Sequence, residues 1–151
     1  MSSQNNIVSL IDASLPNVFQ CASFKKEYRK LFGKSEAQRH EYNKWLLKKL
    51  IILCTRSEED IQETDTFEFL GRGDEYKLYS LRRPEFSGNP RILFASLSNE
   101  DGSVYIMLLM FKELHTGDYQ RMIPVAKKRM EEILTAIKGR PPRRPYTGWH
   151  F

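Results

Sequence analysis

Two long apolar runs joined by a short turn, within residues 89–113, constrain the fold of this chain more than any other feature. The runs "RILFASL" and "SVYIMLLMF" are almost continuously apolar, as expected for strands that are covered on both faces or lie at the centre of a sheet. The intervening "NEDG" predicts a tight turn, because Asp-Gly tolerates the positive backbone angles that a hairpin needs. We therefore expect adjacent antiparallel strands over 90–98 and 103–112.

A cation stands at each end of this hairpin. Arg91 begins the first run and Lys112 ends the second. Both lie far from the turn on opposite strands, so we expect them near the same end of the sheet and roughly in register. Two explanations are open: strand-end cations commonly reach solvent, or both cations face a common anionic substrate.

Helical patterns follow a first strand expected at 17–23. The segment "SFKKEYRKLFG" predicts a helix with Ser23 as its N-cap and Gly33 at its end. The segment "SEAQ" is a capping box that begins a second helix over 35–54. The apolar stripe of the second helix consists of Tyr42, Leu46, Leu50 and Leu53.

The second half of the chain is rich in strand patterns. Residues 55–65 are acidic and predict a loop with one helical turn, and strands are expected at 66–71 and 76–82. A final helix should begin near Pro124, which suits a first helical turn, and end at Gly139. The apolar face of that helix consists of Met122, Ala126, Met130, Ile133 and Ile137.

This order of elements predicts an α+β domain: a small, mostly antiparallel sheet with two N-terminal helices and a C-terminal helix packed on it. Residues 1–16 are expected to be an N-terminal extension, residues 17–139 a single folded domain, and residues 140–151 a basic tail rich in Pro and Arg. We expect the tail to be mobile or ordered only by a partner.

Composition excludes several classes of protein. No apolar run is long enough to span a membrane, and the N-terminus lacks the basic start of a signal peptide, so a cytoplasmic protein is expected. Two cysteines and three scattered histidines argue against a disulfide framework and a metal site. The sequence contains no Gly-rich phosphate loop and no Gly-x-Ser-x-Gly elbow, and no cofactor is expected.

Charge is concentrated at the C-terminus. The chain has a formal charge of +5, of which the segment from Lys138 onward contributes +4, so the body has only +1. Any nucleic-acid site on the body must therefore come from local clustering. A candidate cluster near the sheet consists of Lys77, Tyr79, Arg82, Arg83, Arg91, Lys112, His115 and Tyr119.

Such a cluster suits RNA cleavage by internal transesterification. The 2′-hydroxyl loses a proton and attacks phosphorus, the 5′-oxygen gains a proton, and cations stabilise the negative charge of the phosphorane without a metal. Each residue also has a structural explanation. Strand-end cations reach solvent, His115 is a loop residue, and Tyr79 and Tyr119 are aromatics at the edge of the core.

Five short motifs in succession resemble RelE/HigB-type bacterial toxins of type II toxin–antitoxin systems. They are "SFKKEYRKL", "YKLYSLR", "NPRILFASL", "IMLLMFKE" and "VAKKRM", the last containing Ala126 and Arg129 in an Ala-x-x-Arg pattern. The resemblance covers about residues 17–135. It implies a compact sheet flanked by helices, mRNA cleavage in the A site of the ribosome, and inhibition by a cognate antitoxin.

The resemblance also implies roles for individual residues. Arg91 matches an Arg that contacts the scissile phosphate, Lys77 matches a basic position on the preceding strand, and Lys112 matches the Lys that ends the last strand. Glu113 or His115 would carry the proton.

Three further residues are expected on the RNA-binding surface, namely Tyr119, Arg82 and Tyr79. Tyr119 falls near a Tyr that stacks on the substrate base.

Two alternatives to an mRNA-cleaving toxin stay open. One is a non-catalytic protein of the same fold, either a gyrase inhibitor like the ParE branch or an inactive relative. The other is a plain nucleic-acid-binding domain.

Overall fold

The computed structural model describes residues 8–62, 66–83, 85–99 and 102–138 of the 151-residue chain. These residues form six strands and four helices. In chain order, the elements are β1 (Val8–Leu10), β2 (Val18–Cys21), α1 (Ala22–Leu31), α2 (Glu36–Thr55), α3 (Glu58–Gln62), β3 (Phe67–Arg72), β4 (Lys77–Arg82), β5 (Pro90–Asn99), β6 (Gly102–Lys112) and α4 (Asp118–Lys138).

A single six-stranded sheet has the order β1-β2-β6-β5-β4-β3. All neighbouring strands are antiparallel except β2 and β6, which are parallel. The expected α+β class and mostly antiparallel sheet are confirmed, and so is the central hairpin of β5 and β6. The segment expected as an N-terminal extension provides β1, so two strands precede the first helix.

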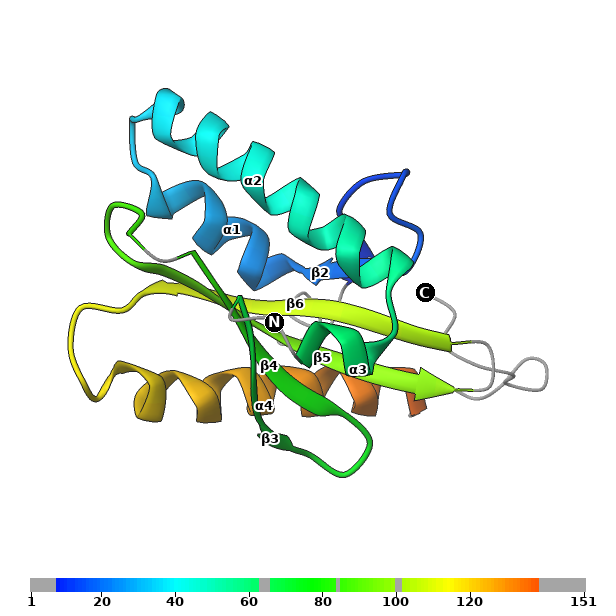
Figure 1. The fold of residues 1–151 in the computed structure, drawn as a ribbon. Helices are drawn as coiled ribbons and strands as arrows, with labels where there is room; N and C mark the ends of the chain where they lie inside the picture. Colours follow the sequence, from blue (N-terminus) through cyan, green and yellow to red (C-terminus); the bar gives the residue numbers. More distant parts are fainter. Residues whose placement is uncertain (1–7, 63–65, 84, 100–101, 139–151) are drawn as a thin grey trace.

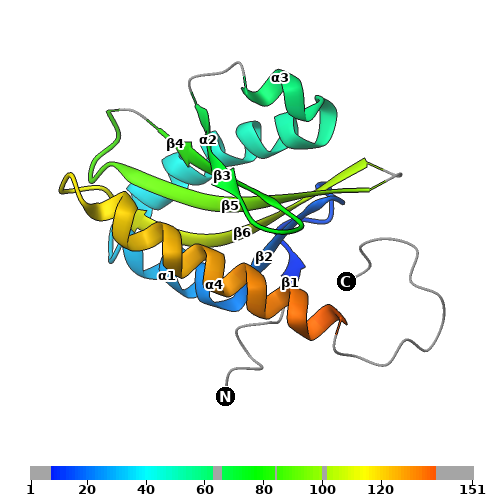
Figure 2. The ribbon, with the colours of Figure 1, turned by 90° about the horizontal axis from the view of Figure 1, so that it is seen from below.

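Helices lie on both sides of this sheet. Figure 1 shows α2 above the sheet and α4 below it, and Figure 2, seen from below, shows α2 and α3 on one side of the sheet and α4 on the other. The apolar residues expected on α2 are all buried and face the core. Arg129 of α4 contacts Glu27 of α1, so α1 also reaches the layer below the sheet.

The ends of α1 and α2 follow local sequence signals only in part. The hydroxyl of Ser35 accepts a hydrogen bond from the backbone N–H of Gln38, as the capping box predicts. Gly33 has a φ of +56° after the end of α1, a conformation that glycine adopts without strain. The prediction that Ser23 caps α1 is wrong, because the cap position is Cys21, which makes no side-chain cap hydrogen bond.

The start of α4 also differs from the sequence prediction. The helix begins at Asp118 and not near Pro124, which lies inside it. Asp118 accepts hydrogen bonds from the backbone N–H groups of Leu114 and His115, at 2.7 and 2.8 Å, and so closes the turn from which the helix starts. The predicted helix end at Gly139, the centre of the β5–β6 turn and the tail 140–151 lie outside the described residues.

Beyond the end of β2, side chains take the place of a neighbouring strand and form hydrogen bonds with the backbone of β6. β2 pairs with Tyr105–Met107, and a bulge follows at Leu108. The Leu108 carbonyl accepts hydrogen bonds from the Cys21 thiol (3.3 Å) and from Arg129 Nη1 (2.8 Å). Glu27 accepts the backbone N–H of Met110 (3.1 Å) and binds Arg129 through both oxygens. Buried backbone groups that a strand would otherwise satisfy are thus paired with side chains.

Candidate functional site

The sheet divides the sequence-predicted site residues between its two faces. Successive side chains of a strand point to opposite faces, and directly opposite residues of an antiparallel pair share a face. Arg82 lies opposite Arg91, whereas Lys77 and Tyr79 lie opposite Ser96 and Phe94. Arg82 and Arg91 therefore share the α4 face, and Lys77 and Tyr79 share the α3 face.

Lys112 does not share a face with Arg91. Arg91 lies opposite Phe111, and Lys112 lies opposite Pro90. The two cations end the same hairpin at the same end of the sheet, as expected, but leave it on opposite faces. The stem of Lys112 packs against the loop before β5, where a Cβ on Gly88 would lie 3.0 Å from Lys112 Cδ.

Lys77 and Tyr79 are held by Glu58 of α3. The Glu58 carboxylate accepts hydrogen bonds from Lys77 Nζ (2.8 Å), the Tyr79 hydroxyl (2.8 Å) and the Ser96 hydroxyl (2.6 Å). Burial raises the pKa of Glu58, but these three hydrogen bonds together outweigh it and hold the pKa below its ordinary value. Tyr79 is fully buried. These residues anchor α3 to the sheet, and Lys77, whose side chain is 32% exposed, is held by Glu58 on the face opposite Arg91.

Arg91 forms an ion pair with Glu113 on the α4 face. Arg91 Nε and Nη2 lie 3.1 and 3.0 Å from Glu113 Oε1, and Nη1 donates to the Pro90 carbonyl at 3.1 Å. The Arg91 side chain is 10% exposed and that of Glu113 is 30% exposed. Glu113 thus offsets the repulsion expected between Arg82 and Arg91 across the strands. In such a pair, the guanidinium can bind a phosphate oxygen, and the partly exposed carboxylate can accept a proton.

A pair of hydroxyl groups lies on the same face. The hydroxyls of Ser80 and Tyr119 are 2.7 Å apart, and the Tyr119 ring packs edge-on against Phe111 at 5.3 Å between centroids. Burial raises the pKa of Tyr119, so the phenol stays protonated near neutral pH. The Tyr119 ring is packed against the protein, and its expected role of stacking on a base has no support in this geometry.

The turn before α4 carries His115, which is exposed. Sequence reasoning missed the residue that shapes this turn, Asp118, which is 3% exposed. Hydrogen bonds from the backbone N–H groups of His115 and Leu114 hold the pKa of Asp118 below its ordinary value. The available signal was an acid in what is the first turn of α4, a position that favours negative charge.

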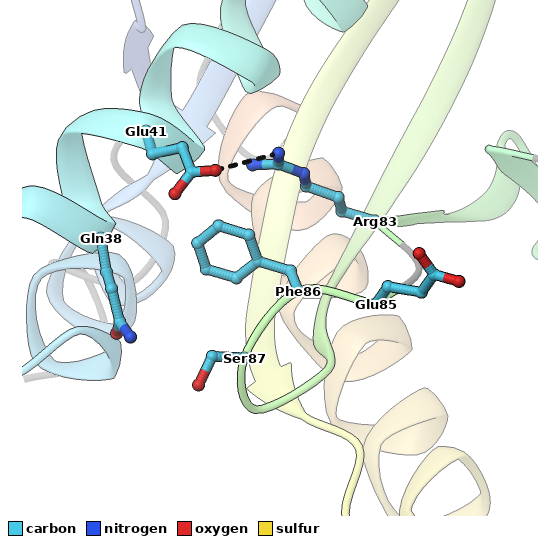
Figure 3. Close-up of a pocket in the computed structure, with 6 residues that line it drawn as sticks. All are labelled: Gln38, Glu41, Arg83, Glu85, Phe86 and Ser87. Atoms are coloured by element: carbon cyan, nitrogen blue, oxygen red, sulfur yellow. Dashed lines mark hydrogen bonds and ion pairs between the residues drawn. The ribbon is translucent and has the colours of Figure 1, made fainter.

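A hollow of about 320 Å³ lies between the start of α2 and the loop after β4 (Figure 3). The Arg83 guanidinium lies 4.6 Å from the ring centroid of Phe86 and 5.6 Å from that of Trp45. Arg83 Nη2 is 3.4 Å from Glu41 Oε1, as the dashed line in Figure 3 marks. The hollow is lined by Gln38, Glu41, Arg83, Glu85, Phe86 and Ser87. Arg83 is thus used in aromatic packing away from the Arg91–Glu113 pair.

The described part of the chain contains no cluster of His, Cys, Asp and Glu that could hold a metal ion, and no helix in it is long and apolar enough to cross a membrane. No protein-family model matches the chain, and comparisons with curated proteins and with solved structures found no similar protein. The fold therefore defines an α+β protein with a six-stranded, mostly antiparallel sheet, and the candidate site is the α4 face around Arg91 and Glu113.

Proposed function

We propose that this chain is an RNA-cleaving toxin of the RelE/HigB type, in which the Arg91–Glu113 pair is the catalytic centre. The observation that carries the proposal is the contact between the two side chains, with Arg91 Nη2 3.0 Å from Glu113 Oε1 at the end of the central hairpin. The five resembling motifs support it further, because they lie on α1, β4, β5, β6 and α4 and follow one another in the order that they have in the toxins.

The proposed reaction is a transesterification within the RNA. The Glu113 carboxylate takes the proton of the 2′-hydroxyl, and the 2′-oxygen attacks the adjacent phosphorus. The bond between phosphorus and the 5′-oxygen breaks, and His115 supplies the proton to that oxygen. Arg91 stabilises the additional negative charge of the phosphorane. The products are a 2′,3′-cyclic phosphate and a free 5′-hydroxyl.

This proposal uses fewer residues than the sequence suggested. Arg82 lies opposite Arg91 and would contact a neighbouring phosphate. Lys77 is bound to Glu58 on the other face, Tyr79 is buried there, and Lys112 points away from Arg91. The proposed substrate is mRNA in the A site of the ribosome, and the proposed partner is a cognate antitoxin.

Induced expression with mapping of mRNA ends tests this function. Wild-type protein should stop growth and produce fragments with cyclic phosphate ends. Arg91→Ala should abolish both effects while the protein remains folded, and Arg91→Lys should restore only part of the activity, since a point charge does not bind two phosphate oxygens as a planar fork does. Glu113→Gln should also remove cleavage. Cleavage at the wild-type rate by Arg91→Ala would exclude this centre.

A non-catalytic binding protein is the second candidate. It is favoured by the way the protein neutralises its own cations: Arg91 is paired with Glu113, and Lys77 with Glu58. Such a protein would arrest growth without cutting mRNA, as a gyrase inhibitor does, or would have no effect on growth. The same expression experiment separates the two candidates, because RNA ends and growth are read independently.

A further inference from the structure

The helical hairpin of α1 and α2 carries far more positive charge than the chain as a whole. Residues 22–56 contain ten Lys and Arg and three Glu, a formal charge of +7, whereas the complete chain has +5. The rest of the chain is therefore −2. The ten cations are Lys25, Lys26, Arg29, Lys30, Lys34, Arg39, Lys44, Lys48, Lys49 and Arg56.

Two of the three acids on this hairpin are already paired with cations from other elements. Glu27 binds Arg129 of α4, with the closest N–O distance at 2.7 Å. Glu41 lies 3.4 Å from Arg83, in the loop after β4. Glu36 remains, at the N-terminus of α2, where its charge favours the helix dipole. The ten cations themselves form no ion pair with any described residue, so their charge is directed at solvent.

Six of the ten cations form helical rows on α1 and α2. Lys25 and Arg29, Lys26 and Lys30, and Lys44 and Lys48 are each four residues apart, and residues at this spacing lie one above the other on a helix. These six side chains belong to exposed residues. With 10 residues in α1 and 20 in α2, the helices are about 15 and 30 Å long, enough to follow several phosphates of a duplex.

The chemistry of this surface indicates which kind of anion it fits. Proteins that bind unpaired bases stack them on exposed aromatic rings. Among the described residues, the only exposed large apolar side chain on the hairpin is that of Ile51. Among the described residues, the hairpin thus combines dense positive charge with no exposed Phe, Tyr or Trp ring. This combination suits a regular phosphate backbone, which is how proteins contact double-stranded RNA.

We propose that the α1–α2 hairpin is a docking surface for the phosphate backbone of duplex RNA. The choice of RNA over DNA rests on the proposed function. The binding surface itself is separate from the Arg91–Glu113 pair. It would hold the protein on a folded RNA while that pair acts on a single strand.

Fluorescence anisotropy with a blunt RNA duplex of about 16 base pairs, the length that a double-strand-binding module spans, tests this surface. The full-length protein should bind with an affinity that falls linearly with salt on logarithmic axes. The variant with Lys25→Ala, Lys26→Ala, Arg29→Ala and Lys30→Ala should bind at least about tenfold more weakly, and its salt slope should fall by about one for each phosphate that is no longer neutralised. Alanine preserves the helix, and a thermal melt checks this.

The matched control removes cations from another helix. Lys127→Ala with Lys128→Ala on α4 should leave the binding and its salt slope unchanged. A second variant, with Arg140, Arg143 and Arg144 replaced by alanine, measures the contribution of the basic tail. The proposal is overturned if the tail variant loses the binding and the α1 variant keeps it, if a single strand binds as tightly as the duplex, or if a DNA duplex binds more tightly.

Failure of this proposal is distinguishable from failure of the proposed function. Arg91→Ala should bind the duplex like the wild type, even though it no longer cleaves mRNA. If the α1 variant cleaves a short unstructured RNA normally but binds the duplex weakly, docking and cleavage are separate properties. If no variant or wild-type protein cleaves RNA but duplex binding depends on α1, only the cleavage proposal is overturned.

Discussion

Arg91 and Lys112 end the same hairpin on opposite faces of the sheet, because Arg91 lies opposite Phe111 while Lys112 lies opposite Pro90. Only Arg91 faces α4 and meets a carboxylate, that of Glu113. Lys112 instead lies along the loop at Gly88. An offset of one residue in register is enough to separate the two charges, since side chains alternate along a strand.

Lys112 is therefore expected to be unimportant for cleavage. Lys112→Ala should keep the rate of RNA cleavage within about threefold of the wild type, as for a surface substitution. Arg91→Ala should lose about a hundredfold to a thousandfold, or about 2.7–4 kcal/mol of transition-state stabilisation. Single-turnover cleavage of a defined mRNA on ribosomes measures both. Equal losses in the two variants would mean that both cations reach the phosphate.

Glu58 should stabilise the fold through the three donors that it satisfies. Glu58→Ala leaves Lys77, Tyr79 and Ser96 without their acceptor, so the free energy of unfolding at pH 7 should fall by about 2–4 kcal/mol. Urea unfolding gives this value. The exposed neighbour on the same helix is the control, and Glu59→Ala should change the free energy of unfolding by about 0.5 kcal/mol or less.

The contribution of Glu58 should also depend on pH. Its pKa is lower in the folded protein than in the unfolded chain, where a glutamate has a pKa of about 4.3. The stabilisation is therefore complete above the unfolded pKa and is lost as the pH falls through the lowered folded value. The difference in unfolding free energy between the wild type and Glu58→Ala should shrink between pH 6 and pH 3. A constant difference would contradict the charged hydrogen-bonding role.

Arg129 should matter for stability because it binds both Glu27 and the Leu108 carbonyl. Arg129→Ala removes the ion pair of the partly buried Glu27 carboxylate and the shorter of the two side-chain hydrogen bonds to the Leu108 carbonyl, which should cost about 3 kcal/mol in unfolding free energy. The adjacent exposed cation provides the control, so Lys128→Ala should have little effect. Denaturant unfolding of both variants measures the difference. A similar small effect in both would show that solvent replaces the Arg129 contacts.

Pro124 should destabilise the helix that contains it. It is exposed and is the seventh residue of α4, where an ordinary residue would donate its backbone N–H to the carbonyl of Gln120. Pro124→Ala restores this donor and removes the clash of the ring, and should raise the free energy of unfolding by up to about 3 kcal/mol. Thermal unfolding checks the increase. A lower melting temperature would mean that α4 begins at Pro124, as the sequence alone suggested.

The sequence by itself determined the elements whose signals are local. Continuous apolar runs predicted β5 and β6, and the helical stripe and capping box of α2 were confirmed in the buried face and in the Ser35 hydroxyl. These signals work because hydrophobic period and cap chemistry depend on residues a few positions apart. The start of α4 was predicted wrongly, because the helix was placed from Pro124 and the acid at Asp118 was not used.

The tertiary structure alone decided which charges meet. Glu58 and Ser96 are separated by 38 residues, and Glu27 and Arg129 by 102, so no local pattern could pair them. The parallel contact of β2 with β6 and the bulge at Leu108 set the face on which each later side chain lies. Arg91 and Lys112 could be placed at one end of a hairpin from sequence, but whether they share a face depends on register, and register is fixed only when the strands pack.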